Sequence, residues 1–346
     1  MRNNFYQEII ERKEPYIIAD IGANHNGDIE LAKKMVDKLS KLGCDAAKFQ
    51  SWSKKSLFVM SFYKERSSFS DERFGTLEQM VEKFALSQDD LITLSEHCRT
   101  RHITFCSSAF SPEEVDLLDE LNVPFFKVAS MDLNNLPFLK YIAKKKKPIV
   151  LSTGMGSLAE IETSLNEIYK TGNREVVLLH CVSIYPPDDR IINLRNIIML
   201  GNVFKVPVGF SDHTIGISIP LAAIALGAKI IEKHFTLDKN LPGWDHAISA
   251  NSKEMEIIIK EGKRIVNALG EYKRVISNAE MEQRGLFRRS IVAKRYIKKG
   301  EIIKEEDLDF KRPGTEIRPD ELKYVIGRKV NRDIEEDEII KWEYLF

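Results

Sequence analysis

Eight short apolar segments recur between residues 16 and 235, and helical patterns separate them. Gly, Pro, Asn or Asp bound each segment, as expected for strands that are buried on both faces of a parallel sheet. Eight strands alternating with helices over roughly 250 residues predict an α/β protein built as a (β/α)8 TIM barrel. An open doubly wound sheet is the alternative, but no G-x-G-x-x-G follows the first strand. The predicted strands cover residues 16–22, 46–51, 103–110, 125–131, 148–155, 176–183, 206–213 and 229–235.

The chain divides into a barrel, a connector and a second, small domain. We place the barrel at residues 1–270, the linker at 271–288 and the second domain at 289–346. At roughly 60 residues the last part is small for an independent core, so we expect it to be stable only when docked. Residues 52–86 form a long insertion after the second strand. Long loops at that position usually serve function as lids or partner contacts.

The charge balance excludes several classes of protein. The chain has 52 basic and 52 acidic residues, whereas general nucleic-acid and anionic-membrane binders carry a surplus of Lys and Arg. No apolar run approaches the ~18–20 residues that span a bilayer. The N-terminal segment MRNNFYQEIIERKEPY lacks the apolar core of a signal peptide. We therefore expect a cytoplasmic protein, and we expect its four cysteines, which form no CxxC pair, to be buried thiols.

Polar side chains follow every predicted strand. In a barrel of this class the active site lies at the C-terminal ends of the strands. A single strand-end Ser usually caps the following helix, but so many polar groups at one rim predict a binding site. The rim residues considered as candidates are Asp20, Lys48, Gln50, Ser108, Lys127, Ser130, Asp132, Ser152, Ser183, Tyr185, Ser211, His213 and His234.

Lys48 and Lys127 lie inside otherwise apolar strands. A Lys is rarely buried without a partner, so each either pairs with a rim carboxylate such as Asp20 or Asp132, or serves a ligand. The ligand reading is a pocket for phosphate or carboxylate, or a Schiff-base lysine. The Ser and Thr hydroxyls nearby favour the anion pocket.

His213 and His234 are predicted at the tips of the seventh and eighth strands. Neighbouring strand tips are close enough for one divalent cation to bridge two imidazoles. Two histidines surrounded by oxygen atoms suit Mn²⁺ or another borderline metal better than a closed zinc site. Alternatively, each histidine only hydrogen-bonds a rim carboxylate, and the spacing alone does not decide between these readings.

A series of motifs follows the predicted barrel strands in order: IADIGANHNG, AAKFQ, FKVASMDLNN, PIVLSTGM, LLHCVSIYP, GFSDHT, EKHFT and PGWDH. The C-terminal segment adds SIVAKRYIKKGEII, DLDFKRPG and IGRKV. Over essentially the whole chain, these motifs resemble those of the sialic acid synthases, and the C-terminal segment resembles their antifreeze-like SAF domain, a β-clip fold. These enzymes make nonulosonic acids by condensing phosphoenolpyruvate with a 2-acetamido sugar.

The resemblance implies a set of roles for these residues. It implies a divalent metal, Mn²⁺ with Mg²⁺ or Co²⁺ as options, at His213 and His234. It implies a homodimer with swapped C-terminal domains, in which Arg312 enters the partner's site and holds the acetamido group. The implied sugar contacts are Gln50, Tyr185, Asp245 and Arg312. The implied phosphoenolpyruvate pocket comprises Lys48, Ser108, Lys127, Ser130, Ser152, Ser183 and Ser211.

The implied reaction joins C3 of phosphoenolpyruvate to the aldehyde of the open-chain sugar, and phosphate leaves by C–O cleavage after water adds at C2. Asp132 is our first candidate to orient or deprotonate that water, Asp20 is the second, and Lys127 is the catalytic lysine. The rival enzyme is a Schiff-base aldolase that uses Lys127 or Lys48 and needs no metal. The alternative that is not an enzyme is a carbohydrate-binding protein built on a catalytically inactive barrel.

Several positions depart from the family's pattern. Asp20 and Asp132 stand where sialic acid synthases carry Glu, and Ser183 stands where they carry Asn. Ala109 replaces Pro, and Trp244 lies inside the PG-x-D motif. Because both carboxylates are shorter, the sequence does not decide between two sugar substrates. These are N-acetylmannosamine and a 6-deoxy diacetamido hexose, as used for legionaminic or pseudaminic acid.

Overall fold

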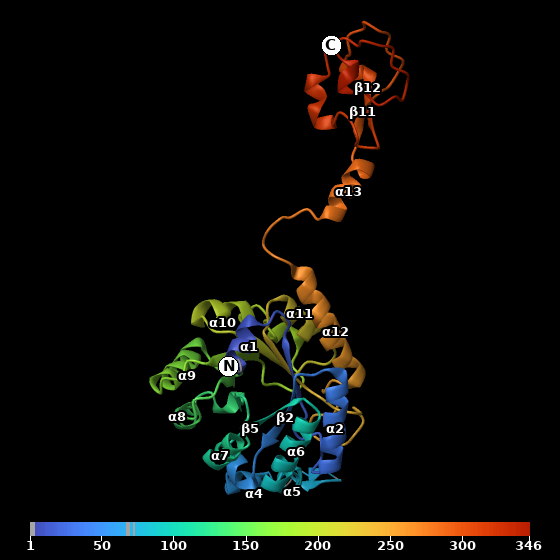
Figure 1. Cartoon of the computed structure of the whole chain (residues 1–346). Coiled ribbons are helices and arrows are strands. Elements are labelled where there is room, and N and C mark those ends of the chain that lie inside the picture. The colour runs from blue at the N-terminus through green and yellow to red at the C-terminus, as the bar shows by residue number, and fades with distance from the viewer. Residues whose placement is uncertain (1–3, 67–69, 72) are drawn as a thin grey trace. The chain divides into compact units, whose positions relative to one another are not determined.

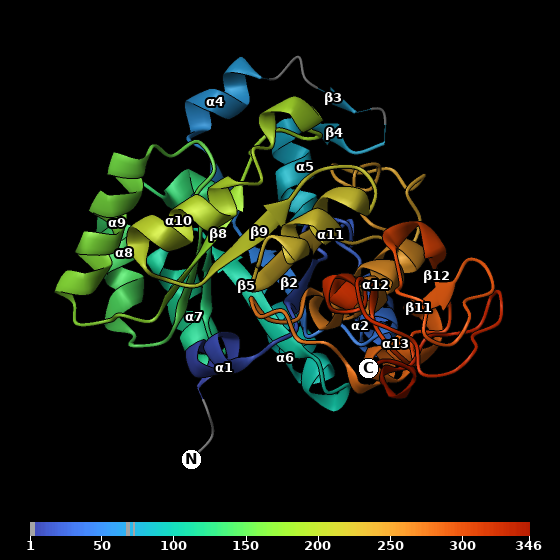
Figure 2. The ribbon, with the colours of Figure 1, turned by 90° about the horizontal axis from the view of Figure 1, so that it is seen from above.

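A computed structural model describes residues 4–66, 70–71 and 73–346. The chain forms two compact units, Met1–Gly270 and Glu271–Phe346. In the larger unit the predicted barrel is confirmed. Its parallel strands close in the order β1-β10-β9-β8-β7-β6-β5-β2, with helices around the ring (Figures 1 and 2). No helix in the described part of the chain combines the length and apolar character needed to cross a bilayer.

Each barrel strand lies within its predicted range and mostly ends earlier, because the polar residues at its C-terminal end leave the ladder to form loops. The strands are β1 (Tyr16–Asp20), β2 (Ala46–Ser51), β5 (Thr104–Ala109), β6 (Phe126–Val128), β7 (Ile149–Ser152), β8 (Val176–Cys181), β9 (Val208–Asp212) and β10 (Ile230–His234). A helix follows each strand: α2 (Ile29–Leu42), α6 (Gln88–Thr100), α7 (Pro112–Glu120), α8 (Leu136–Lys144), α9 (Leu158–Lys170), α10 (Asn196–Phe204), α11 (Ser218–Ala225) and α12 (Ser252–Leu269). Short 3-10 turns, η1 (Ser130–Asp132) and η2 (Asp189–Ile191), complete the barrel loops.

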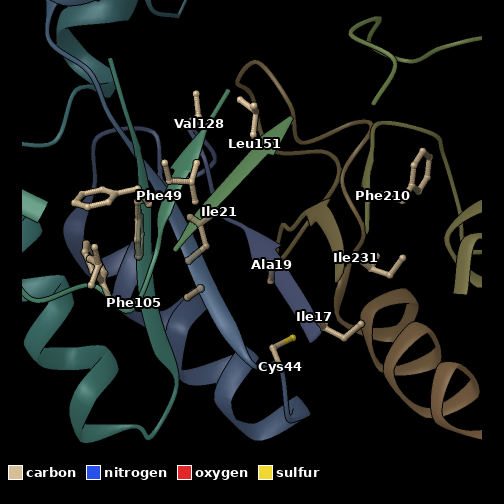
Figure 3. Close-up of a cluster of buried hydrophobic side chains, with 14 of the residues drawn as sticks. Ile17, Ala19, Ile21, Cys44, Phe49, Phe105, Val128, Leu151, Phe210 and Ile231 are labelled. Carbon is tan, nitrogen blue, oxygen red and sulfur yellow. The ribbon is translucent and has the colours of Figure 1, made fainter. Parts of the chain in front are cut away.

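The two-residue period of the strands separates two cores. In β1, Ile17 and Ala19 face the helices, as does Ile21 just beyond the strand, and they join the large outer core (Figure 3). Tyr16 and Ile18 face the barrel axis and belong to a second, inner cluster. The inner cluster comprises Phe5, Ile9, Tyr16, Ile18, Ala46, Cys106, Phe125, Val150, Val177, Leu179 and Ile230.

An N-terminal helix that we did not predict, α1 (Phe5–Glu11), contributes to the inner cluster. The Phe5 ring stacks on Phe125, with centroids 4.1 Å apart, and meets Tyr16 edge-on at 5.2 Å. Asn4 caps this helix, since its side chain accepts a hydrogen bond from the Gln7 amide. The inner cluster therefore forms an apolar floor inside the barrel.

The insertion after β2 folds into short elements with a small core of their own. These elements are α3 (Lys54–Leu57), α4 (Met60–Glu65), β3 (Ser70–Asp71), β4 (Gly75–Thr76) and α5 (Leu77–Phe84), which Figure 2 shows at one edge of the barrel. The buried members of that core are Ala23, Trp52, Tyr63, Met80, Val81 and Phe84.

The smaller unit contains α13 (Asn278–Phe287), which lies in the predicted linker, and the antiparallel strands β11 (Ser290–Ala293) and β12 (Leu308–Lys311). Three 3-10 turns follow: η3 (Glu305–Asp307), η4 (Pro319–Tyr324) and η5 (Trp342–Tyr344). The unit buries its own apolar cluster, formed by Ile291, Ala293, Ile297, Ile303, Leu308, Ile317, Val325, Val330, Ile334, Ile340 and Tyr344. The four cysteines of the chain are buried free thiols, as predicted.

Two glycine substitutions test the packing of the barrel. A Cβ on Gly209 in β9 would lie 2.5 Å from the Ile230 carbonyl oxygen and 2.6 Å from Leu179 Cδ2. We expect Gly209→Ala to lower the free energy of unfolding by about 1–3 kcal/mol, because the site is already filled. On α10, a Cβ on Gly201 would find its nearest neighbour at 3.7 Å. Gly201→Ala is therefore expected to stabilise by about 0.5–1 kcal/mol.

Urea unfolding of both variants, followed by circular dichroism, measures these effects. Equal stability of the two variants would contradict the packing described for the barrel interior.

Candidate active site

A cavity of about 300 Å³ opens at the C-terminal ends of the barrel strands. Of the predicted site residues, it brings together Asp20, Lys48, Gln50, Ser108, Lys127, Ser130, Ser152, Ser183, Tyr185, Ser211, His213 and His234. The other lining residues are Phe110, Ala129, Met131, Met155, Cys181 and Glu232.

The two-residue period explains why the strands deliver these side chains. The apolar floor residue Ile18 is followed two positions later by Asp20, and Ala46 is followed in the same way by Lys48. The same step leads from Phe125 to Lys127. One layer of polar and charged side chains therefore lies directly above the apolar floor, on the same inner face of the barrel.

Lys48 and Asp20 form a buried ion pair, with Nζ 2.8 Å from Oδ2. Burial alone would lower the pKa of Lys48, but the carboxylates of Asp20 and Glu232 raise it above its usual range. Burial alone would also raise the pKa of Asp20, and Lys48 and His234 instead hold it below its usual value. Lys48 lines the cavity and is paired with Asp20 at the same time, so it can both hold this ion pair and contact a bound ligand.

Lys127 is the second lysine that lines the cavity. Its Nζ donates to Ser152 Oγ at 2.8 Å and to the Val128 carbonyl oxygen at 3.1 Å, and it lies 3.5 Å from Glu232 Oε1. Burial lowers the pKa of Lys127, and the nearby charge of Glu232 only partly opposes this effect. The aldolase alternative therefore fits Lys127 better than Lys48, because a Schiff-base lysine must lose its proton.

Glu232 is a site residue to which sequence analysis assigned no role. Its Oε1 accepts a hydrogen bond from Ser211 Oγ at 3.0 Å, and its buried Oε2 has no hydrogen-bond partner among the described residues. The signal was available: like Lys48, it is a charged residue at an inward position of an apolar strand. Its neighbour Lys233 points the other way and forms a structural ion pair with Asp212, at 2.6 Å.

Hydroxyl groups and a close backbone turn line the wall between β6 and β8. The Gly154 amide donates to Ser130 Oγ at 3.0 Å. A Cβ on Gly154 would lie 2.3 Å from Ser183 Oγ and 2.7 Å from Ser130 Oγ. Only a residue without a side chain lets the backbone pass so close to both hydroxyls. Hydroxyls and amides gathered beside lysines can bind a phosphate or carboxylate.

His213 and His234 lie beside each other at the ends of the adjacent strands β9 and β10, with ring centroids 5.5 Å apart, and both line the cavity. The Tyr185 ring lies over His213 at a centroid distance of 4.0 Å. His213 Nδ1 lies 3.0 Å from the Val182 carbonyl oxygen. Because a carbonyl oxygen only accepts, Nδ1 carries a proton there, so Nε2 is the nitrogen that can offer a lone pair to a cation.

The two imidazoles fit an open site for a divalent cation. Within the part of the chain that the structure describes, His234 Nδ1 is buried without a hydrogen-bond partner, 3.5 Å from Asp20 Oδ2, and Asp20 Oδ1 has no partner either. Across residues 4–66, 70–71 and 73–346, no three His, Cys, Asp or Glu side chains converge as a complete metal site. A cation held by two protein nitrogens would leave coordination positions for water or substrate.

Three predicted site residues lie outside the cavity lining. Asp132 is buried in η1, where its Oδ1 accepts from Asn135 Nδ2 at 3.0 Å and burial raises its pKa. Asp245 is half-buried in the loop after β10. In the smaller unit, the Arg312 guanidinium lies over the Phe287 ring, 5.1 Å from its centroid. The roles of these three residues remain predictions.

Comparison with known proteins agrees with this geometry. The NeuB family model matches residues 35–274, and the SAF domain model matches residues 288–345. The chain is 41% identical to the N,N'-diacetyllegionaminic acid synthase of Campylobacter jejuni, over 95% of this chain and 99% of that protein. It is 36% identical to the human N-acetylneuraminate-9-phosphate synthase, over 95% of this chain and 92% of that protein.

Among solved structures, the N-acetylneuraminic acid synthetase of Leptospira borgpetersenii matches 78% of this chain and 90% of its own. That match has a TM-score of 0.69 and 34% sequence identity. The family model and these relatives together cover both units. The chain therefore belongs to the NeuB family and is an enzyme of the sialic acid synthase type.

Proposed function

We propose that this enzyme condenses phosphoenolpyruvate with an open-chain 2-acetamido sugar and releases phosphate by C–O cleavage. The observation that carries the proposal is the pairing, in one cavity, of an anion-binding floor with two neighbouring histidines. The floor is formed by Lys48, Lys127 and the surrounding hydroxyls. A cavity of this composition suits one polyanionic substrate and one neutral, polar substrate held side by side.

Phosphoenolpyruvate is proposed to bind between Lys48 and Lys127. Their buried ammonium groups lie where the desolvated anion would gain most from charge-assisted hydrogen bonds. Ser130, Ser152 and Ser183 supply further hydrogen bonds. Held in this way, C3 of phosphoenolpyruvate attacks the aldehyde carbon C1 of the sugar, and the protein contributes chiefly by aligning the two reactants.

His213 and His234 are proposed to hold a divalent cation, most simply Mn²⁺. When bound there, the cation supplies Lewis-acid polarisation of the aldehyde oxygen. Tyr185 covers His213 and restricts the approach of water from that side. The hydrogen bond between His213 Nδ1 and the Val182 carbonyl oxygen holds the imidazole ring in one orientation.

Carbon–carbon bond formation leaves positive charge at C2 of the former phosphoenolpyruvate, where water adds. Asp20 and Glu232 are better supported than Asp132 for orienting this water. Both line the cavity, and each has a buried oxygen for which the described residues supply no hydrogen-bond partner. The low pKa of Asp20 keeps it ionised as an acceptor. The tetrahedral intermediate then expels phosphate by breaking the C2–O bond.

An exposed apolar rim supports the proposal that a second subunit completes the site. Met131, Met155 and Tyr185 line the cavity, yet they are 55%, 74% and 54% exposed. Large apolar side chains gathered at a cavity mouth mark a surface that another molecule covers. We propose the partner's C-terminal domain as that cover in a swapped homodimer, with its Arg312 bound to the acetamido oxygen.

For the sugar, we propose a 6-deoxy diacetamido hexose of the legionaminic type. Two relatives named N,N'-diacetyllegionaminic acid synthase are 41% and 37% identical to this chain, against 36% for the human N-acetylneuraminate-9-phosphate synthase.

The first prediction concerns the metal. His213→Ala or His234→Ala should weaken Mn²⁺ binding by more than about 100-fold and abolish turnover, because one imidazole holds the cation poorly. Calorimetric titration of Mn²⁺ into the apoprotein and phosphate release from phosphoenolpyruvate measure the two effects. Chelation should inactivate the wild type, and added Mn²⁺ should restore its activity.

Full activity in the presence of chelator would reject the metal hypothesis and favour the Schiff-base aldolase. In that case borohydride would trap a substrate adduct at Lys127.

The second prediction concerns the anion floor. Lys48→Met and Lys127→Met should each raise the KM for phosphoenolpyruvate about 30-fold or more, because a buried charge that meets the substrate is lost. Lys229→Met is the matched control. Lys229 lies at the N-terminal end of β10, where its Nζ donates to the Arg12 carbonyl oxygen at 3.0 Å. Steady-state kinetics at saturating sugar measure the KM for phosphoenolpyruvate. An unchanged KM in both Lys48→Met and Lys127→Met would reject the proposed phosphoenolpyruvate pocket.

The third prediction concerns Arg312. Arg312→Ala should raise the KM for the sugar far more than that for phosphoenolpyruvate. Mixed with a His213→Ala variant, it should form heterodimers in which one site carries both lesions and the other carries none. Random exchange then restores about a quarter of wild-type activity. Native mass spectrometry counts the heterodimers. Heterodimers as inactive as their parents would exclude action across the interface.

A further inference from the structure

The insertion after β2 and the loop after β10 share an aromatic cluster. The Trp244 ring lies 5.8 Å from the Trp52 ring and meets the Phe84 ring edge-on at 5.2 Å. Trp52 comes directly after β2, Phe84 ends α5, and Trp244 belongs to the loop after β10. Two segments nearly 200 residues apart in sequence are therefore held together by three rings.

The same cluster reaches the wall of the cavity. Trp52 is buried, its indole N–H points to the Val81 carbonyl oxygen at 3.4 Å, and its ring contacts Phe110 at 6.2 Å. Phe110 follows β5 and lines the cavity. A change in the position of Trp52 would therefore move Phe110, because the interior is close-packed.

Trp244 also fixes the turn that presents Asp245. That turn is pinned on both sides of Trp244. Asn26 Nδ2 donates to the Pro242 carbonyl oxygen at 2.8 Å, and Ser249 Oγ donates to the Asp245 carbonyl oxygen at 2.6 Å. Between these two anchors, the Trp244 ring is the side chain that ties the turn to the insertion.

The charged part of the cavity comes from strands. Lys48, Lys127, Ser152 and Glu232 line the cavity and belong to β2, β6, β7 and β10, whereas the rings of Trp52, Phe84 and Trp244 belong to the insertion and to the loop after β10. A disturbance of the rings should therefore reach the side of the cavity formed by loops and leave the side formed by strands in place.

We infer that Trp244 is a positioning residue that sets which 2-acetamido sugar the enzyme accepts. Its ring, held by Trp52 and Phe84, fixes Asp245 and the Phe110 wall, and the insertion serves as the support for that contact. The inference rests on the proposed function and on the sugar contact that the family resemblance implies for Asp245. It also gives a task to Trp244, which lies inside the PG-x-D motif.

The test measures selectivity in Trp244→Ala and Trp244→Phe. The two substrates are N-acetylmannosamine and a 6-deoxy diacetamido hexose, each at saturating phosphoenolpyruvate. Trp244→Ala should raise the KM for the preferred sugar about tenfold and change the ratio of the two kcat/KM values about fivefold or more. The KM for phosphoenolpyruvate should change less than about twofold, and Trp244→Phe should retain the wild-type ratio to within about twofold.

Tyr169→Ala is the matched control, because it removes a half-buried ring from α9 that does not line the cavity. It should lower the melting temperature and leave the selectivity ratio unchanged. Should Trp244→Ala not fold, Trp244→Leu keeps apolar volume while removing the ring contacts, and the same changes are expected of it.

An unchanged ratio in folded Trp244→Ala, or equal losses toward both sugars and phosphoenolpyruvate, would overturn the inference and leave the proposed function standing. A wild type that turns over neither sugar with phosphoenolpyruvate would overturn both.

Discussion

The site depends on charges that are buried inside the barrel. Lys48 pairs with Asp20 at 2.8 Å, and Lys127 lies 3.5 Å from Glu232. Each ion loses several kcal/mol of hydration on burial, and attraction within a pair offsets this cost only in part. Apolar side chains of similar size would serve stability as well or better. The pairs therefore make sense as a preorganised receptor for a charged substrate, and the oxygens of Asp20 and Glu232 that have no partner among the described residues agree with this reading.

Strands and loops of the barrel form different parts of the cavity. Strands supply Lys48, Lys127, Ser152 and Glu232, and each of these side chains stands two residues beyond a residue of the apolar floor, so the barrel core holds it rigidly. Loops supply Tyr185 and Phe110 to the cavity wall, which we propose faces the sugar. Because loops tolerate change better than strands, enzymes of this type can keep one anion site while the sugar side varies.

Much of the fold and of the cavity was predictable from the sequence. Their place inside otherwise apolar strands drew attention to Lys48 and Lys127, and both line the cavity. Glu232 and Lys233 are adjacent charged residues in one apolar strand, and the structure shows that Glu232 lines the cavity whereas Lys233 pairs with Asp212. The α1 helix was not predicted because it is short, and its burial depends on Phe125, far away in sequence. Asp132 resembled a rim residue, yet its 3-10 turn carries it out of the cavity lining.

The position of cleavage tests the account most directly. Phosphoenolpyruvate labelled with ¹⁸O in the bridging C2–O–P oxygen is turned over with the sugar, and ³¹P NMR measures the isotope shift of the released phosphate. The proposed mechanism breaks the C2–O bond, so the label should leave with phosphate, and release should require the sugar. Unlabelled phosphate would mean cleavage of the O–P bond, and it would contradict the water addition at C2 on which the proposed roles of Asp20 and Glu232 rest.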